Sequence, residues 1–238
     1  MSGHSKWSTI KHAKALTDAA RSGQFTKLVR EITMAAKLGD KAPENNPRLR
    51  LAILNARKAS MPSDNIKRAI DKASDKNTES YEMVRYEGYG PGNVPIIVEA
   101  MTDNPRRTVP EVRSTFAKNG GNMGAEGSVI FMFTHAGLIF YPLSAAKSED
   151  EMTEIIMDAG ADDLETSPDG YIVKTKPEDF MTVQKALSDK LGEPEKAELT
   201  WLPNMPMELS DDAYAKLERL VDALDANDDV QKVITAAQ

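Results

Sequence analysis

The chain contains no cysteine, which excludes disulfide bonds, thiolate nucleophiles and zinc sites built on sulfur. Its three histidines are too few to build a zinc site of the usual kind by themselves. No apolar run approaches the roughly 18 residues that a membrane span requires, and the first residues lack the apolar segment of a secretory signal. We therefore expect a cytoplasmic protein with no membrane partner.

Sequence signatures of enzymes are also missing. There is no Gly-x-Ser-x-Gly nucleophile elbow, and no glycine-rich loop continues into Gly-Lys-Ser or Gly-Lys-Thr. Residues 225–230 resemble the start of a calcium-binding loop, but valine stands where that loop requires glycine. If Met1 is removed, Ser2-Gly3-His4 offers the nitrogen ligands of a copper site, for which we expect no physiological role. We expect no catalytic residue, no cofactor, no physiological metal site and no small-molecule substrate.

Positive charge is concentrated in the first third of the chain. Residues 1–75 hold 15 of the 30 Lys and Arg residues but only 7 of the 37 Asp and Glu residues, a balance of +8. Residues 137–202 hold 6 cations and 15 anions, and the pieces 76–136 and 203–238 together hold 9 and 15. Only the first third is therefore electrostatically suited to a phosphate backbone. We favour nucleic-acid binding there over a merely solvated basic surface.

Residues 1–75, which we call the head, are expected to be helical. Polar residues with Gly and Pro at 39–47 separate two helices, and Pro62 suits the first turn of a third. Residues 74–80 read as a polar linker. Apolar residues at helical spacing predict that the inner faces of these helices lie at 25–36, 49–56 and 66–73.

After the linker, strand and helix patterns alternate. Residues 94–101 form a β-branched run that predicts a strand. Thr108 with Glu111 has the spacing of a capping box that opens a helix. Residues 129–133 are expected to be the returning strand of this first βαβ unit.

Two glycine-rich stretches flank that unit. Residues 86–92 lack the spacing of a dinucleotide-binding loop, and we expect a turn that joins two domains. Residues 120–128 link the helix to the next strand. A phosphate contact is conceivable there, but the C-terminal cap of a helix is favoured.

Residues 138–201 show the order strand, helix, strand, strand, helix, strand, which is typical of the split-βαβ or ferredoxin-like motif. A short strand at 207–209, a helix capped by Ser210 and a strand at 230–234 follow. We predict a multidomain α+β protein with a helical domain and two split-βαβ α/β domains, one inserted in the other. The predicted domains are the basic helical head 1–75, the discontinuous α/β domain 76–136 with 203–238, and the acidic ferredoxin-like α/β domain 137–202.

Cations of the head alternate with an aromatic ring and an imidazole. Lys11, Lys14 and Arg21 share one face of a predicted helix. Arg50 and Arg57 repeat the seven-residue spacing in a later helix. Such cations neutralise phosphates, and an aromatic ring can stack on an exposed base. The predicted nucleic-acid-binding residues are Lys6, Trp7, Lys11, His12, Lys14, Arg21, Lys27, Arg30, Arg50, Arg57 and, near a helix N-terminus that also favours anions, Arg106 and Arg107.

Several short motifs occur in order along the chain, and together they resemble the YebC/PmpR family. They are Gly3–Trp7, Ile10–His12, Phe25–Leu28, Met61–Ile66, Tyr86–Gly92, Thr102–Asn104 with Arg107-Thr108, Gly120–Asn122 with Gly127–Val129, Val221–Leu224 and Asp229–Gln231. This resemblance implies a helical N-terminal domain followed by two α/β domains. It also implies a cytoplasmic transcriptional regulator that binds DNA, as bacterial members are described. Relatives that include the mitochondrial translational activator of cytochrome c oxidase subunit I act on translation and associate with ribosomes.

We therefore predict a non-enzymatic, DNA-binding regulator of transcription. The first alternative is a ribosome-associated translation factor that binds ribosomal RNA and assists elongation. A hydrolase or metalloenzyme is the second, against which the missing triad and ligands argue. A protein–protein adaptor is the third, and it predicts no salt-dependent binding of nucleic acid.

Overall fold

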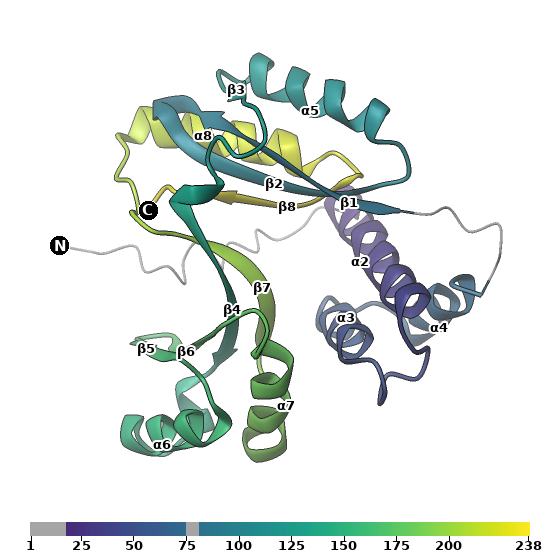
Figure 1. Cartoon of the computed structure of the whole chain (residues 1–238), viewed down its shortest axis with the longest axis vertical. Coiled ribbons are helices and arrows are strands. Elements are labelled where there is room, and N and C mark those ends of the chain that lie inside the picture. The colour runs from purple at the N-terminus through teal and green to yellow at the C-terminus, as the bar shows by residue number, and fades with distance from the viewer. Residues whose placement is uncertain (1–17, 75–80) are drawn as a thin grey trace. The chain divides into compact units, whose positions relative to one another are not determined.

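A computed structural model describes residues 18–74 and 81–238, with side chains from residue 23 onward. The described residues divide into two compact units, of which one comprises residues 134–202 and the other all the rest (Figure 1). Each unit contains one four-stranded antiparallel sheet. The predicted α+β class, with a helical region before the sheets, is confirmed. None of the described helices is both long and apolar enough to cross a membrane.

The described part of the head consists of α2 (Asp18–Leu38), α3 (Pro47–Lys58) and α4 (Ser63–Lys72). Their apolar faces lie at the predicted positions and meet in one core, which includes Ile32, Leu49 and Ala56. The hydroxyl of Thr33 on α2 donates to the carbonyl of Ala69 on α4 over 3.0 Å. The three helices therefore form one small bundle, which Figure 1 shows around α2.

The first sheet has the strand order β3-β1-β2-β8. Helices α5 and α8 cover one of its faces (Figure 1). Every residue of β2 except Glu99 is buried, because this strand lies between two others and under the helices. Strands β2 and β3 with α5 between them form a split βαβ unit, since β1 lies between the two strands. The elements are β1 (Glu82–Gly90), β2 (Val94–Thr102), α5 (Pro105–Lys118), β3 (Asn122–Met123), α8 (Asp211–Asp225) and β8 (Val230–Thr235).

The prediction that residues 86–92 form a joining turn was wrong. Most of this stretch completes β1, and the turn is a short 3₁₀ segment at Pro91–Asn93. Glycine suits positions 88 and 90 because neighbouring strands and the covering helices lie close to β1, and the backbone carbonyl of Asn122 on β3 would lie 2.6 Å from a Cβ atom on Gly88. A Cβ atom on Gly88 would lie 3.0 Å from a phenylalanine ring of α5, and one on Gly90 would lie 2.8 Å from a leucine of α8.

Two further local predictions around α5 were wrong. Residues 129–133 do not form the returning strand: Ile130–Met132 is a 3₁₀ turn, and β3 returns instead. Thr108 does not cap α5 but lies inside it, because the helix already begins at Pro105 after the N-cap residue Asn104. Proline suits this first position, since its missing amide would have had no partner there.

The C-terminal piece was predicted more closely. Ser210 caps α8, and its hydroxyl accepts a hydrogen bond from the Ala213 amide over 3.4 Å. Strand β8 then joins the first sheet beside β2. In place of the predicted strand at 207–209, Met207 forms only a single parallel bridge with Ala237.

The unit of residues 134–202 confirms the predicted order strand, helix, strand, strand, helix, strand. Its sheet has the order β5-β6-β4-β7. The Ser148 hydroxyl caps α6 by accepting from the Glu151 amide over 3.2 Å. The elements are β4 (Phe133–Tyr141), α6 (Glu149–Ala159), β5 (Asp163–Ser167), β6 (Gly170–Thr175), α7 (Phe180–Leu191) and β7 (Lys196–Pro203).

Candidate nucleic-acid interface

The turn between α2 and α3 is fixed by one buried asparagine. The side-chain oxygen of Asn46 accepts from the Leu49 amide over 3.0 Å and so caps α3. Its side-chain amide donates to the carbonyls of Ala35 (2.8 Å) and Asp40 (2.6 Å). Because one side chain satisfies groups on both sides of the turn, α3 is held in a definite orientation on α2.

Helix α3 presents two arginines on one side. Arg50 and Arg57 are two turns apart, and Arg50 is half-buried while Arg57 is exposed. Neither side chain makes an ion pair or hydrogen bond with another described residue. By contrast, Arg48 donates through two nitrogens to the carboxylate of Glu31 on α2, over 2.8 and 3.0 Å. One cation of α3 thus holds the bundle together, and two remain available for an external anion.

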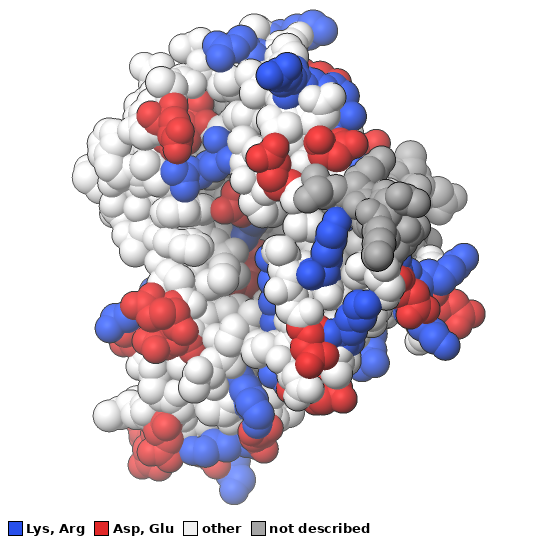
Figure 2. All heavy atoms as spheres, turned by 45° about the vertical axis from the view of Figure 1, so that its right-hand side comes forward, with Lys and Arg blue, Asp and Glu red and all other residues white. Residues whose placement is uncertain are grey.

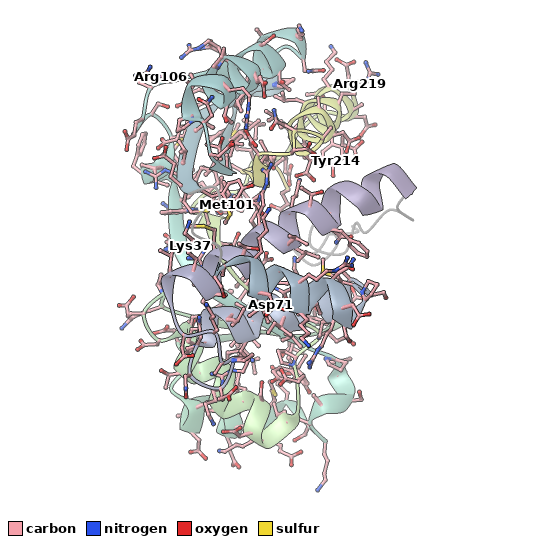
Figure 3. The ribbon with its side chains drawn as sticks, turned by 90° about the vertical axis from the view of Figure 1, so that its right-hand side faces the viewer. Lys37, Asp71, Met101, Arg106, Tyr214 and Arg219 are labelled. Carbon is pink, nitrogen blue, oxygen red and sulfur yellow. The ribbon has the colours of Figure 1, made fainter. Side chains whose placement is uncertain are left out.

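Two predicted contact residues on α2 bind the turn between α8 and β8. The ammonium group of Lys27 donates to the backbone carbonyl of Asp225 over 2.8 Å and to its carboxylate over 3.1 Å. Arg30 donates to the Asp228 carbonyl over 2.5 Å and to the Asp229 carboxylate over 3.0 Å. It also donates to the carbonyl of Met101, which lies beside α2 in Figure 3, over 3.2 Å. These contacts attach α2 to the first sheet.

Asp229 is the acceptor at the centre of this attachment. Besides Arg30, it accepts hydrogen bonds from Arg107 (2.9 Å), Thr108 (2.7 Å) and Thr102 (3.0 Å). Its carboxylate is only 4% exposed. Burial raises the pKa of Asp229, but the hydrogen bonds from Arg107 and the two threonines outweigh it and hold this pKa below its ordinary value. Three segments distant in sequence therefore meet on one ionised carboxylate.

The predicted loop 120–128 is organised by a second buried carboxylate. Glu87 on β1 accepts from the amides of Val129 (2.8 Å), Ile130 (2.9 Å) and Gly127 (3.1 Å). Burial raises the pKa of Glu87, but these backbone hydrogen bonds and one from Arg85 together lower it. The amides of Gly127, Val129 and Ile130 therefore face an internal anion and are not available to a phosphate. As expected, the start of the loop caps α5.

The predicted contact residues fall into three groups, according to whether the structure describes them and whether they bind a group within the chain. Lys6, Trp7, Lys11, His12 and Lys14 lie outside the described residues, as does the Ser2-Gly3-His4 copper motif, and only the backbone of Arg21 is described. Lys27, Arg30 and Arg107 bind carboxylates within the chain. Arg50, Arg57 and Arg106 make no side-chain ion pair or hydrogen bond with a described residue.

Other chemistry finds little support in the described parts of the chain. Within them, no three His, Asp or Glu side chains come together as metal ligands do. The ring of His135 stacks on Trp201, with 4.4 Å between ring centroids, so it serves packing. A pocket of about 440 Å³ lies beside Asp229. Its lining includes Arg30, Arg107 and Asp229, which are already hydrogen-bonded to one another.

Two family models together match most of the chain. A model of the TACO1/YebC protein N-terminal domain matches residues 5–76. A model of the TACO1/YebC second and third domain matches residues 81–237 and bears the name Transcrip_reg. The chain belongs to the TACO1/YebC family. The crystal structure of a conserved hypothetical protein, Aq1575 from Aquifex aeolicus, is 44% identical, with a TM-score of 0.83 over 98% of this chain and 96% of that one.

Two residues that organise this TACO1/YebC chain were not singled out as site residues from its sequence. Glu87 stands among aromatic residues and glycines, and Asp229 directly precedes the strand β8. An acidic residue inside or beside an apolar strand is costly to bury unless it is bound. An acidic residue in an apolar stretch was therefore the sequence signal that could have identified Glu87 and Asp229. It does not reveal which donors bind each carboxylate.

The two buried carboxylates predict a specific loss of stability in acid. Their folded-state pKa values lie below the unfolded ones, so their stabilisation is present above about pH 4 and is lost as the pH falls through the folded values. We expect the free energy of unfolding, measured with urea, to fall from about pH 4 downward. An Asp229→Asn variant should show a shallower fall, whereas Glu44→Gln, at an exposed position, should keep the parent slope. Equal slopes for all three proteins would contradict this assignment.

Proposed function

We propose that this TACO1/YebC protein regulates gene expression by binding nucleic acid, and that its target is DNA. The observation that carries the proposal is the pair Arg50 and Arg57. Both lie on one side of α3, and neither is neutralised by another described residue. They belong to the head, whose balance of +8 contrasts with the acidic remainder of the chain. Unpaired cations on a basic helical domain favour a phosphate backbone.

The surrounding surface supports a localised contact. On the face shown in Figure 2, Lys and Arg side chains are interspersed with Asp and Glu over much of the surface. Such mixed charge gives a weak field at a distance, because opposite charges cancel over a few ångströms. We propose that Lys6, Lys11, Lys14 and the ring of Trp7, which the sequence predicts as contact residues, also bind the nucleic acid.

We further propose that the protein acts by binding and not by catalysis, in the cytoplasm. The ring of His135 stacks on Trp201, and the two buried carboxylates are occupied by internal donors. The acidic domain proposed at residues 137–202 carries 6 cations against 15 anions, which suits it poorly to a polyanion. We assign it to contacts with other partners.

The salt dependence of DNA binding tests the proposal. We expect an Arg50→Gln/Arg57→Gln variant to bind duplex DNA more weakly, with a salt slope reduced by up to about 1.8, or about 0.9 for each lost phosphate contact. Lys11→Ala/Lys14→Ala/Arg21→Ala should act in the same direction. The matched control is Lys185→Gln/Lys190→Gln on α7, which removes the same charge far along the sequence. Fluorescence anisotropy over about 50 to 200 mM salt measures each slope.

If both head variants bind DNA and ribosomes as the parent does, the head is not the contact surface. Crosslinking in cells, followed by sequencing of DNA and RNA together, then separates the targets. Enrichment of promoter DNA supports transcriptional regulation. Enrichment of ribosomal RNA instead would contradict the DNA target and support the translation factor.

A further inference from the structure

We infer that helix α5 is a second phosphate-binding surface, which contacts the nucleic-acid backbone through Arg106 and Arg113. This inference rests on the proposed function and adds a contact outside the head. Both arginines are exposed, and neither makes a side-chain ion pair or hydrogen bond with another described residue. They are seven residues apart, which places them on the same side of the helix, about 10 Å from each other.

The charge of α5 differs from that of the sequence around it. The pieces 76–136 and 203–238 hold 9 cations and 15 anions, yet α5 carries four cations and a single carboxylate, Glu111. Figure 2 shows Lys and Arg side chains gathered at the top of the molecule, where Figure 1 places α5. The helix is therefore a basic element within an acidic region.

Three of the four cations on helices α6, α7 and α8 are neutralised, and Arg219 on α8 is the exception. Lys185 pairs with Asp189, Lys190 with Asp158 and Lys216 with Asp212. Each of these pairs is exposed and contributes little to stability, but it cancels the field of the cation.

On α5 itself, Arg106 and Arg107 are adjacent in the sequence, but only Arg107 is neutralised by carboxylates. Arg107 binds Asp103 and Asp229, whereas Arg106 projects at the outer side of the helix (Figure 3). Around Arg113, the helical neighbours three and four positions away are valine, proline, phenylalanine and alanine, so no carboxylate is placed to pair with it.

The helix that carries the two arginines is rigidly attached. Its residues Thr108, Val112 and Phe116 are buried, and the Thr108 hydroxyl donates to Asp229. A fixed scaffold lowers the conformational entropy lost when the side chains bind. Guanidinium groups also suit phosphates well, because their fork of donors matches two phosphate oxygens.

The spacing fits a nucleic-acid strand as the occupant. Successive phosphates of one strand advance about 3.4 Å along the duplex axis and also turn around it, so two flexible arginines about 10 Å apart can each reach a different, nearby phosphate of the strand. An acidic protein surface presents no such regular array of charges. The second contact would make binding more dependent on salt than the head alone can explain.

The test compares the salt slope of duplex DNA binding for five proteins: the parent, the head variant, two α5 variants and the α7 control. We expect Arg106→Gln/Arg113→Gln to lower the slope by up to about 1.8, as the head variant does. We expect the α7 control Lys185→Gln/Lys190→Gln to keep the parent slope. Arg106→Lys/Arg113→Lys should also keep most of it, because charge is retained. An unchanged thermal unfolding temperature of the α5 variant would show that a lower slope is not due to unfolding.

The outcomes separate this inference from the proposed function. If the head variant lowers the slope and the α5 variant does not, the second surface is wrong and the proposed function stands. If the parent itself shows no salt-dependent binding of DNA, the proposed function fails and this inference fails with it. Loss of binding to an acidic polypeptide, with DNA binding intact, would likewise overturn the assignment of α5 to phosphates.

Discussion

Replacing Asp229 with alanine is expected to destabilise the protein by about 3 kcal/mol. The change leaves the guanidinium groups of Arg30 and Arg107 without their shared acceptor. It also removes the carboxylate that accepts hydrogen bonds from the hydroxyls of Thr102 and Thr108. Removal of one partner from a buried ion pair costs about 3 to 5 kcal/mol. The low end applies here because the Arg107 side chain is 45% exposed and regains water.

Urea unfolding at neutral pH measures this effect, and the neighbouring Asp228 supplies the control. Arg30 uses only the backbone carbonyl of Asp228, so Asp228→Ala should change the free energy of unfolding by less than about 0.5 kcal/mol. A difference of less than about 1 kcal/mol between the two variants would contradict the central role of Asp229.

The second large effect is expected for Glu87→Ala. This change leaves the amides of Gly127, Val129 and Ile130 without an acceptor. A buried donor without a partner costs about 1 to 3 kcal/mol. Only the hydrogen bond to Val129 is fully buried, so we expect a total of about 3 kcal/mol rather than three full penalties.

Hydrogen exchange localises the effect of Glu87→Ala. Amides of residues 124–132 should exchange faster in the variant, because the loop loses its internal anion. Glu82→Ala, at an exposed position of the same strand, should leave these amides unchanged. Equal exchange of this segment in parent and variant would show that the loop is held by other contacts.

The sequence predicts much of the fold because the strongest patterns are local. The apolar stripes of the head and the Ser210 cap depend on residues a few positions apart. Strand β1 was missed because its glycines look like a turn when the covering helices are not known. Those glycines lie against side chains of α5 and α8, which are distant from them in the sequence.

The candidate site could be predicted only in outline for a similar reason. Charge counts identify the basic head but do not separate paired cations from unpaired ones. Arg106 and Arg107 are adjacent in the sequence, yet only Arg107 reaches Asp229, which lies 122 residues further along. Lys27 and Arg30 likewise find carboxylates 198 and 199 residues away. Such pairings depend on the sheet topology, which charge patterns do not encode.

The position of β8 beside β2 has a consequence for folding during synthesis on the ribosome. The strand that completes the first sheet is made last, after the whole unit of residues 134–202 has been synthesised. That unit can therefore fold while its host is still unfinished, since domains fold as units in the order of their emergence. Until Asp229 emerges, Arg30 and Arg107 lack the carboxylate that joins them. A nascent chain truncated before residue 229 would thus leave Arg30 without a carboxylate partner and Arg107 with Asp103 alone.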